Sequence, residues 1–116
     1  MACIMNATIN YAIAEDYVDP LYTLDSKAER MVYANQMAYK YNISASDLKR
    51  TIKGESGWNP SAIGDGGYSI GMCQIHLPSH PSVSYEQALD PKFCLEWTAE
   101  KFSQGKARMW TAYRNL

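Results

Sequence analysis

The sequence predicts an all-α domain, or α with minor β, and two observations support this class. Segments whose apolar residues recur every three or four positions are preceded by recognisable helix-start signals. No segment alternates apolar and polar residues as a half-buried strand does. Hydrophobic residues make up 47% and charged residues 20% of the 116 residues. That balance is typical of a single globular domain and argues against a disordered chain.

The N-terminal stretch precedes the better-marked helices. A first helix is expected over residues 6–17, ended by Pro20. We expect residues 1–25 to form an N-terminal extension packed on the rest of a single domain that spans 1–116. The stretch carries acidic residues and lacks a basic start followed by an apolar block, so it is not a secretory signal peptide.

The next helix is expected from about Lys27 to Tyr41. Ser26 and Glu29 form a Ser-x-x-Glu capping box, in which each side chain satisfies a backbone N–H that the helix itself leaves unpaired. Asn42 is expected to end this helix, because asparagine tolerates the left-handed backbone conformation.

A third helix is expected over residues 47–56, capped by Ser46 or Ser44 and with Gly57 as its stop. Leu48, Ile52 and Glu55 occupy positions i, i+4 and i+7 and therefore share one helix face. Glu55 thus lies in line with residues that point into the core. Burial favours the protonated form of a carboxyl group, so Glu55 can donate a proton to a leaving-group oxygen. The alternative is a structural glutamate bonded to backbone N–H groups of the following loop.

The rest of the chain alternates loops and short helices. Residues 59–67 are a glycine-rich loop. Ser69 is expected to cap a short helix that runs to about Ile75, and residues 76–82 are expected to be extended or turned. Three further helical segments follow: a turn capped by Ser84 and Gln87, a helix from Asp90-Pro91 to about Ser103, and a last turn within 106–114.

Charge and cysteine content exclude several classes of function. The net charge is −1 without a basic stripe, so we expect no binding to nucleic acid, and no apolar run is long enough for a membrane span. The cysteines, Cys3, Cys73 and Cys94, lack metal-ligand spacing, so we expect no metal and no cofactor. Cys73 and Cys94 either close a disulfide or remain two buried thiols, and the sequence favours neither.

Two blocks carry a resemblance to a known family. E-S-G-W-N-P-S-A begins at Glu55, and G-G-Y-S-I-G-M-C-Q-I follows it, before Asp90-Pro91. In this order the blocks resemble the lytic transglycosylase SLT domain, a branch of the lysozyme-like superfamily, over roughly residues 27–113. The resemblance implies a lysozyme-like helical domain with a substrate cleft. It also implies a monomer that acts on the cell wall, with a peptidoglycan glycan strand as its partner.

The resemblance also implies a reaction. It is the cleavage of the β-1,4 bond between N-acetylmuramic acid and N-acetylglucosamine. Glu55 matches the family's catalytic glutamate, which protonates the glycosidic oxygen. The same residue then acts as a base on the C6 hydroxyl of the muramoyl ring and leaves a 1,6-anhydro end.

Other residues match the family's cleft positions or depart from them. Gln74 matches a cleft glutamine, with a glutamine bonded to backbone as the alternative. Ile75 and His76 continue that block, and His76, which stands where methionine is common, either lines the cleft or is exposed. Ser69 is equally a cleft residue and a plain helix cap. Tyr113 is near where the family places a cleft tyrosine, although the usual Tyr-Asn-Ala-Gly ending is replaced here.

Asp65 leaves two alternative functions open. As a base that activates water, it would make the enzyme an inverting hydrolase, a muramidase that uses Glu55 with Asp65. Otherwise Asp65 with Gly66 is an ordinary turn pair, which we favour. The altered C-terminal region motivates a further alternative, a glycan-binding domain without activity.

Overall fold

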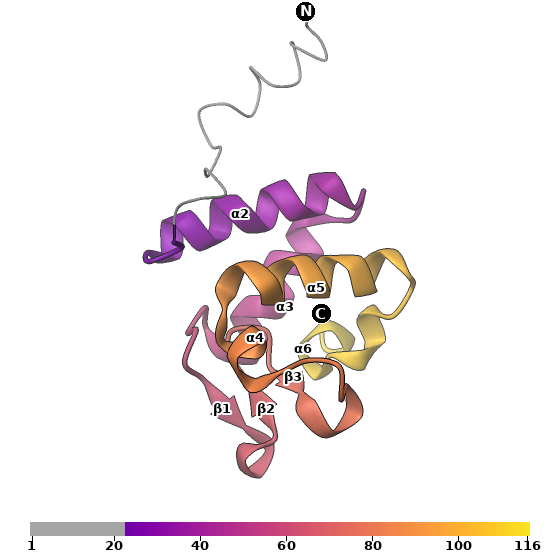
Figure 1. Cartoon of the computed structure of the whole chain (residues 1–116). Coiled ribbons are helices and arrows are strands. Elements are labelled where there is room, and N and C mark those ends of the chain that lie inside the picture. The colour runs from indigo at the N-terminus through magenta and orange to yellow at the C-terminus, as the bar shows by residue number, and fades with distance from the viewer. Residues whose placement is uncertain (1–22) are drawn as a thin grey trace, which may run out of the picture.

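The computed structural model describes residues 23–116, and it is mostly helical with a small antiparallel sheet, as the sequence predicted (Figure 1). The helix expected over residues 6–17 lies outside this range. The helices are α2 (Lys27–Lys40), α3 (Ala45–Ser56), α4 (Tyr85–Leu89), α5 (Pro91–Ser103) and α6 (Thr111–Arg114). The strands are β1 (Ile63–Gly64), β2 (Ser69–Ile70) and β3 (Ile75–His76), and 3-10 turns cover Asp65–Gly67, Leu77–Ser79 and Ala107–Met109.

The capping predictions for α2 are confirmed. Ser26 Oγ accepts the N–H of Glu29 at 3.0 Å, and Glu29 Oε1 accepts the N–H of Ser26 at 2.9 Å. Asn42, just after the helix, has a φ of 55°, which is the left-handed conformation that ends it. Helix α3 begins at Ala45 rather than at residue 47, because Ser44 caps it.

The prediction of a helix from Ser69 to Ile75 is wrong. Ser69 and Ile70 form β2, and β3 follows, with Ile70 paired to Ile75 in antiparallel register. Between the strands Gly71 has a φ of 81° and Gln74 a φ of 53°. A right-handed helix cannot contain these left-handed residues, so the chain reverses instead. Strands of two residues are too short to show the alternation of apolar and polar residues from which a strand is predicted.

In the C-terminal half, the caps of α4 and α5 agree with the helix starts that the sequence predicts. Ser84 and Gln87 form the expected capping box over α4. Asp90 Oδ1 accepts the N–H of Lys92 at 3.0 Å, with Pro91 in the first turn of α5. The expected last helical segment is divided into a 3-10 turn and α6. Among residues 23–116, no helix has the length and apolar character needed to cross a membrane.

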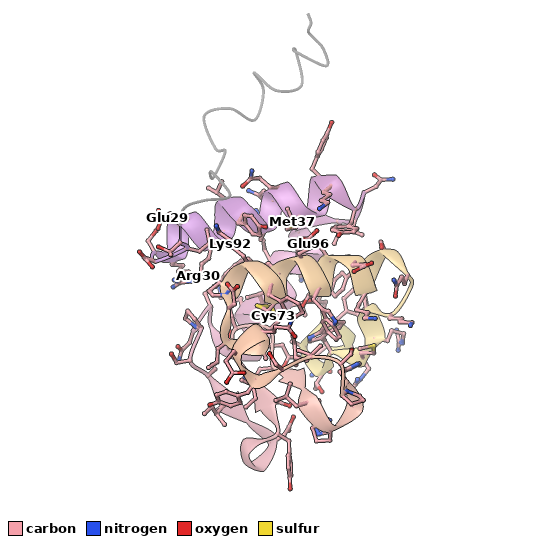
Figure 2. The ribbon with its side chains drawn as sticks, viewed as in Figure 1. Glu29, Arg30, Met37, Cys73, Lys92 and Glu96 are labelled. Carbon is pink, nitrogen blue, oxygen red and sulfur yellow. A yellow bond between two sulfur atoms is a disulfide. The ribbon has the colours of Figure 1, made fainter. Side chains whose placement is uncertain are left out.

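Helices α2 and α5 lie side by side at one end of the molecule, and the sheet lies at the other end (Figure 1). Glu96 of α5, labelled in Figure 2, links the pair: it accepts the Tyr41 hydroxyl at 2.7 Å and pairs with Lys40. Leu24, from the described end of the N-terminal stretch, is buried in the same core. The core joins α2, α3, the sheet and α5 through Ala34, Ala38, Leu48, Ile52, Ile70, Ile75, Leu95 and Ala99.

Cys73 and Cys94 form a disulfide, which decides between the two alternatives that the sequence left open. The bond joins the β2–β3 turn to α5, and both residues are fully buried. Figure 2 shows Cys73 in the interior beside α5. The two cysteines are 21 residues apart. Closing a loop of that length stabilises a small domain by about 3 kcal/mol in the chain-entropy model.

Candidate functional site

A pocket of about 420 Å³ lies where the end of α3 meets the sheet, α5 and the C-terminal segment. Of the residues that the sequence assigned to a site, all except Tyr113 line this pocket. They are Glu55, Asp65, Ser69, Gln74, Ile75 and His76. The sequence did not single out the other parts of the wall, which include His80, Trp97, Met109, Trp110, Thr111 and Arg114.

Glu55 is half-buried in the last turn of α3, in line with the fully buried Leu48 and Ile52. Its Oε2 accepts the backbone N–H of Ala112, in the first turn of α6, at 2.9 Å. A bond to backbone N–H was the alternative considered for this residue. Here the donor comes from a distant helix and not from the following loop. Glu55 is therefore held through one oxygen while it borders the pocket.

Ser56 holds the end of α3 against the sheet. Its hydroxyl donates to the carbonyl oxygen of Met72 at 2.6 Å, in the β2–β3 turn. Glu55 contacts α6 and Ser56 contacts the turn, so the last turn of α3 is anchored on both sides. This anchoring limits the positions that the Glu55 carboxyl group can take.

Asp65 and Ser69 form a hydrogen-bonded pair at the pocket wall. The buried Ser69 hydroxyl donates to Asp65 Oδ2, so Ser69 is not the helix cap that one prediction made it. Asp65 is exposed, has a φ of 51° and opens the 3-10 turn Asp65–Gly67. The expected turn is present, and it also presents the Asp65 carboxyl group to the pocket.

Gln74 lines the pocket and also supports the loop around it. Its amide nitrogen donates to the carbonyl oxygens of Gly71 at 2.9 Å and Ala62 at 3.1 Å. The backbone-bonded glutamine considered as the alternative is therefore present. Because these bonds occupy the amide N–H groups, contact with a ligand is left to the carbonyl oxygen of the side chain.

Ile75 and His76 come from β3. Ile75 is buried and contributes to both the core and the pocket wall, whereas His76 is half-buried. Nδ1 of His76 lies 2.9 Å from the hydroxyl oxygen of Ser79, and its ring meets the exposed Tyr68 edge-on, with centroids 6.2 Å apart. His76 is therefore not exposed but half-buried, and it borders the pocket.

Tyr113 is absent from the described pocket wall, in contrast to the prediction. Its ring packs edge-on against Phe102 of α5, with centroids 5.4 Å apart. On α6 and its cap, Trp110, Thr111 and Arg114 face the pocket instead. Their i, i+1 and i+4 spacing, which places residues on one helix face, is the signal that could have found them.

Aromatic side chains form one part of the wall. Trp110 is buried, and its indole N–H donates to the carbonyl oxygen of Cys73 at 2.8 Å. Trp97 meets Trp110 edge-on at 5.9 Å, and His80 meets Trp97 edge-on at 4.8 Å between centroids. These rings give the pocket an apolar surface beside its carboxyl groups.

The surroundings of His80 lower its pKa. Partial burial, here against Trp97, holds the pKa of His80 below its ordinary value of 6.5. The charges of Lys101, His76 and Lys106 lower that pKa further, by smaller amounts. The neutral imidazole is therefore favoured in the folded protein.

This shift predicts a loss of stability in mild acid. The unfolded chain binds a proton on His80 more readily, so the free energy of unfolding should fall as the pH drops below 6.5 and level off below the lowered pKa. Urea unfolding at about pH 7.5 and about pH 5.5 measures this loss. His80→Phe should lose less stability over the same interval. An equal loss in both proteins would assign the effect to other groups.

Arg114 contributes a positive charge to the pocket wall. Its guanidinium donates to the carbonyl oxygen of Arg108 at 2.8 Å and to the Thr111 hydroxyl at 3.1 Å. The first of these bonds links the 3-10 turn Ala107–Met109 to α6, and the second lies within α6. Within residues 23–116, no group of His, Cys, Asp or Glu side chains is arranged to hold a metal ion.

No family model, curated protein or solved structure matches this chain.

Proposed function

We propose that this protein is a peptidoglycan lytic transglycosylase with Glu55 as its general acid and base. One observation carries the proposal: Glu55, half-buried in α3, borders a pocket of about 420 Å³ and is held there through one carboxylate oxygen. A positioned carboxyl group at a pocket is what proton transfer to a leaving group requires. The resemblance of the Glu55 block and the Gly71–Ile75 block to the SLT domain supports the same function.

The proposed reaction needs one carboxyl group and consumes no water. Glu55 donates its proton to the glycosidic oxygen as the bond from C1 of the muramoyl ring breaks. The N-acetyl carbonyl oxygen of the substrate stabilises the cation at C1. Glu55, now a carboxylate, takes the proton of the C6 hydroxyl, and the C6 oxygen bonds to C1. The products are a free 4-hydroxyl end and a 1,6-anhydro end, and Glu55 is protonated again.

The pocket suits a sugar ligand in size and in chemistry. Its volume lies within the range of about 300–1,000 Å³ that is usual for pockets that bind small ligands. The half-buried Trp97 provides apolar surface for the C–H faces of sugar rings. The side-chain oxygen of Gln74 and the guanidinium of Arg114 provide a hydrogen-bond acceptor and donors for hydroxyl and acetamido groups.

A specific observation keeps the hydrolytic muramidase as a second candidate. Asp65 lines the same pocket, where the Ser69 hydroxyl orients its carboxyl group. A carboxylate held in this way could activate a water molecule opposite Glu55, which would make the enzyme an inverting hydrolase.

Analysis of the reaction products tests both functions. Purified peptidoglycan is digested with the protein and with Asp65→Asn, and the soluble fragments are identified by mass spectrometry. We expect 1,6-anhydro ends from both proteins, at rates that differ by less than about threefold, because Asp65 has no part in the proposed mechanism. Reducing ends that vanish in Asp65→Asn would establish the hydrolase. Tight binding to the glycan with no soluble product would establish a glycan-binding domain.

A further inference from the structure

Gly54 and Ala112 are in contact directly beside Glu55. We propose that the backbone N–H of Ala112 stabilises the negative charge that forms on Glu55 during proton transfer, and that Gly54 is the positioning residue that lets this N–H reach the carboxylate. The inference rests on the proposed function, because it assigns these residues a part in that reaction.

Gly54 has no local reason to be a glycine. It lies inside α3, where glycine weakens a helix relative to alanine, and unlike Gly57 it has no left-handed φ that would favour glycine. A Cβ built on Gly54 would lie 2.7 Å from Cβ of Ala112, too close for two carbon atoms. The close approach of α6 to α3 therefore explains this glycine.

The same close approach creates the contact with Glu55. Ala112 supplies both the methyl group that faces Gly54 and the N–H that donates to Glu55 Oε2 at 2.9 Å. Trp110, the N-cap of α6, makes no side-chain capping bond. Glu55 thus accepts one of the first-turn N–H groups of α6 that the helix cannot pair itself. A methyl group on Gly54 would push α6 outward and lengthen this bond.

The bond assigns different tasks to the two oxygens of Glu55. Oε2 is engaged by Ala112, so Oε1 is the oxygen that gives its proton to the glycosidic oxygen and later receives the proton of the C6 hydroxyl. When Oε1 loses its proton, negative charge spreads over both oxygens. A backbone N–H already aimed at Oε2 stabilises that charge without any rearrangement, as preorganised donors do in other active sites.

Exchanging glycine and alanine between positions 54 and 112 tests the positioning role of Gly54. Gly54→Ala should lower kcat about tenfold and change KM by less than about twofold, because the displaced N–H matters mainly as charge develops. Ala112→Gly retains the N–H and removes the methyl group that faces Gly54, so its kcat is the reference against which the double variant is compared. The double variant Gly54→Ala/Ala112→Gly restores the space and should recover most of the lost kcat. Wild-type kcat in Gly54→Ala, or a double variant no faster than it, would overturn the proposal.

A second measurement does not depend on activity. In NMR spectra, the amide proton of Ala112 should shift as Glu55 is protonated on lowering the pH. The shift should disappear in Glu55→Gln and weaken in Gly54→Ala. If the wild type shows no such shift, the Ala112–Glu55 contact is refuted whatever the activity. If the shift is present but peptidoglycan gives no product, the contact stands, and the proposed function and the catalytic role of the N–H fail together.

Discussion

Glu55→Gln is expected to slow the release of soluble peptidoglycan fragments by about a thousandfold, within the range that general acid–base groups contribute. Glutamine has nearly the same shape, and its side-chain oxygen can still accept the N–H of Ala112, so the fold should be retained. It has no proton to give to the glycosidic oxygen, and it is too weak a base to take one from the C6 hydroxyl. The same substitution thus removes both steps assigned to Glu55.

The control for this prediction is another glutamate outside the pocket. Glu100 is exposed on α5, and Glu100→Gln makes the same chemical change outside the pocket, so this variant should digest peptidoglycan at the wild-type rate. Thermal unfolding of both variants shows whether either substitution disturbs the fold. A folded Glu55→Gln variant that still cleared cell walls at the wild-type rate would exclude Glu55 as the acid.

The helix starts could be predicted because their causes are local. Ser26 and Glu29 each accept the other's backbone N–H within one turn. At the start of α5, Asp90 accepts the N–H of Lys92, and Pro91 has no N–H that needs a partner. Because the residues in such interactions lie within four positions of each other, they form short motifs that can be recognised in the sequence.

The sheet could not be predicted in the same way. A serine before an apolar residue predicts the start of a helix at Ser69, but the Ser69 hydroxyl instead donates to Asp65. The reversal that separates β2 from β3 depends on Gln74 adopting a positive φ, which its residue type does not suggest. Two bonds from the Gln74 amide to backbone carbonyl oxygens stabilise that conformation, and these are seen only in the folded loop.

In the candidate site, too, the residues that could be predicted are those whose neighbours in the sequence identify them. The predicted residues that line the pocket lie within one stretch, from Glu55 to His76, where neighbouring motifs could be compared with a known family. Trp97 and Arg114 come from α5 and α6, which only tertiary packing brings to the same pocket. Tyr113 was predicted from sequence position alone, and its place on α6 turns its ring toward Phe102.

Gly71→Ala is expected to destabilise the protein by about 4 kcal/mol, from backbone strain and steric overlap together. Gly71 has a φ of 81°, where any residue with a Cβ is strained. A Cβ there would also overlap the backbone carbonyl oxygen of Ala88 in α4, and a backbone atom cannot rotate away as a side chain can. The β2–β3 turn would have to shift, and with it Met72, whose carbonyl oxygen accepts the Ser56 hydroxyl. Urea unfolding measures the loss.

Gly66→Ala separates the two causes. Gly66 has a φ of 66°, and a Cβ there would meet no atom within 4 Å. It should therefore carry the backbone strain alone and lose only about 1 kcal/mol. If the two variants lost the same stability, the overlap with Ala88 would not be the reason that glycine occupies position 71. Because Gly71 shapes the turn that anchors the end of α3, its substitution should also slow glycan cleavage, whereas Gly66→Ala should affect cleavage little.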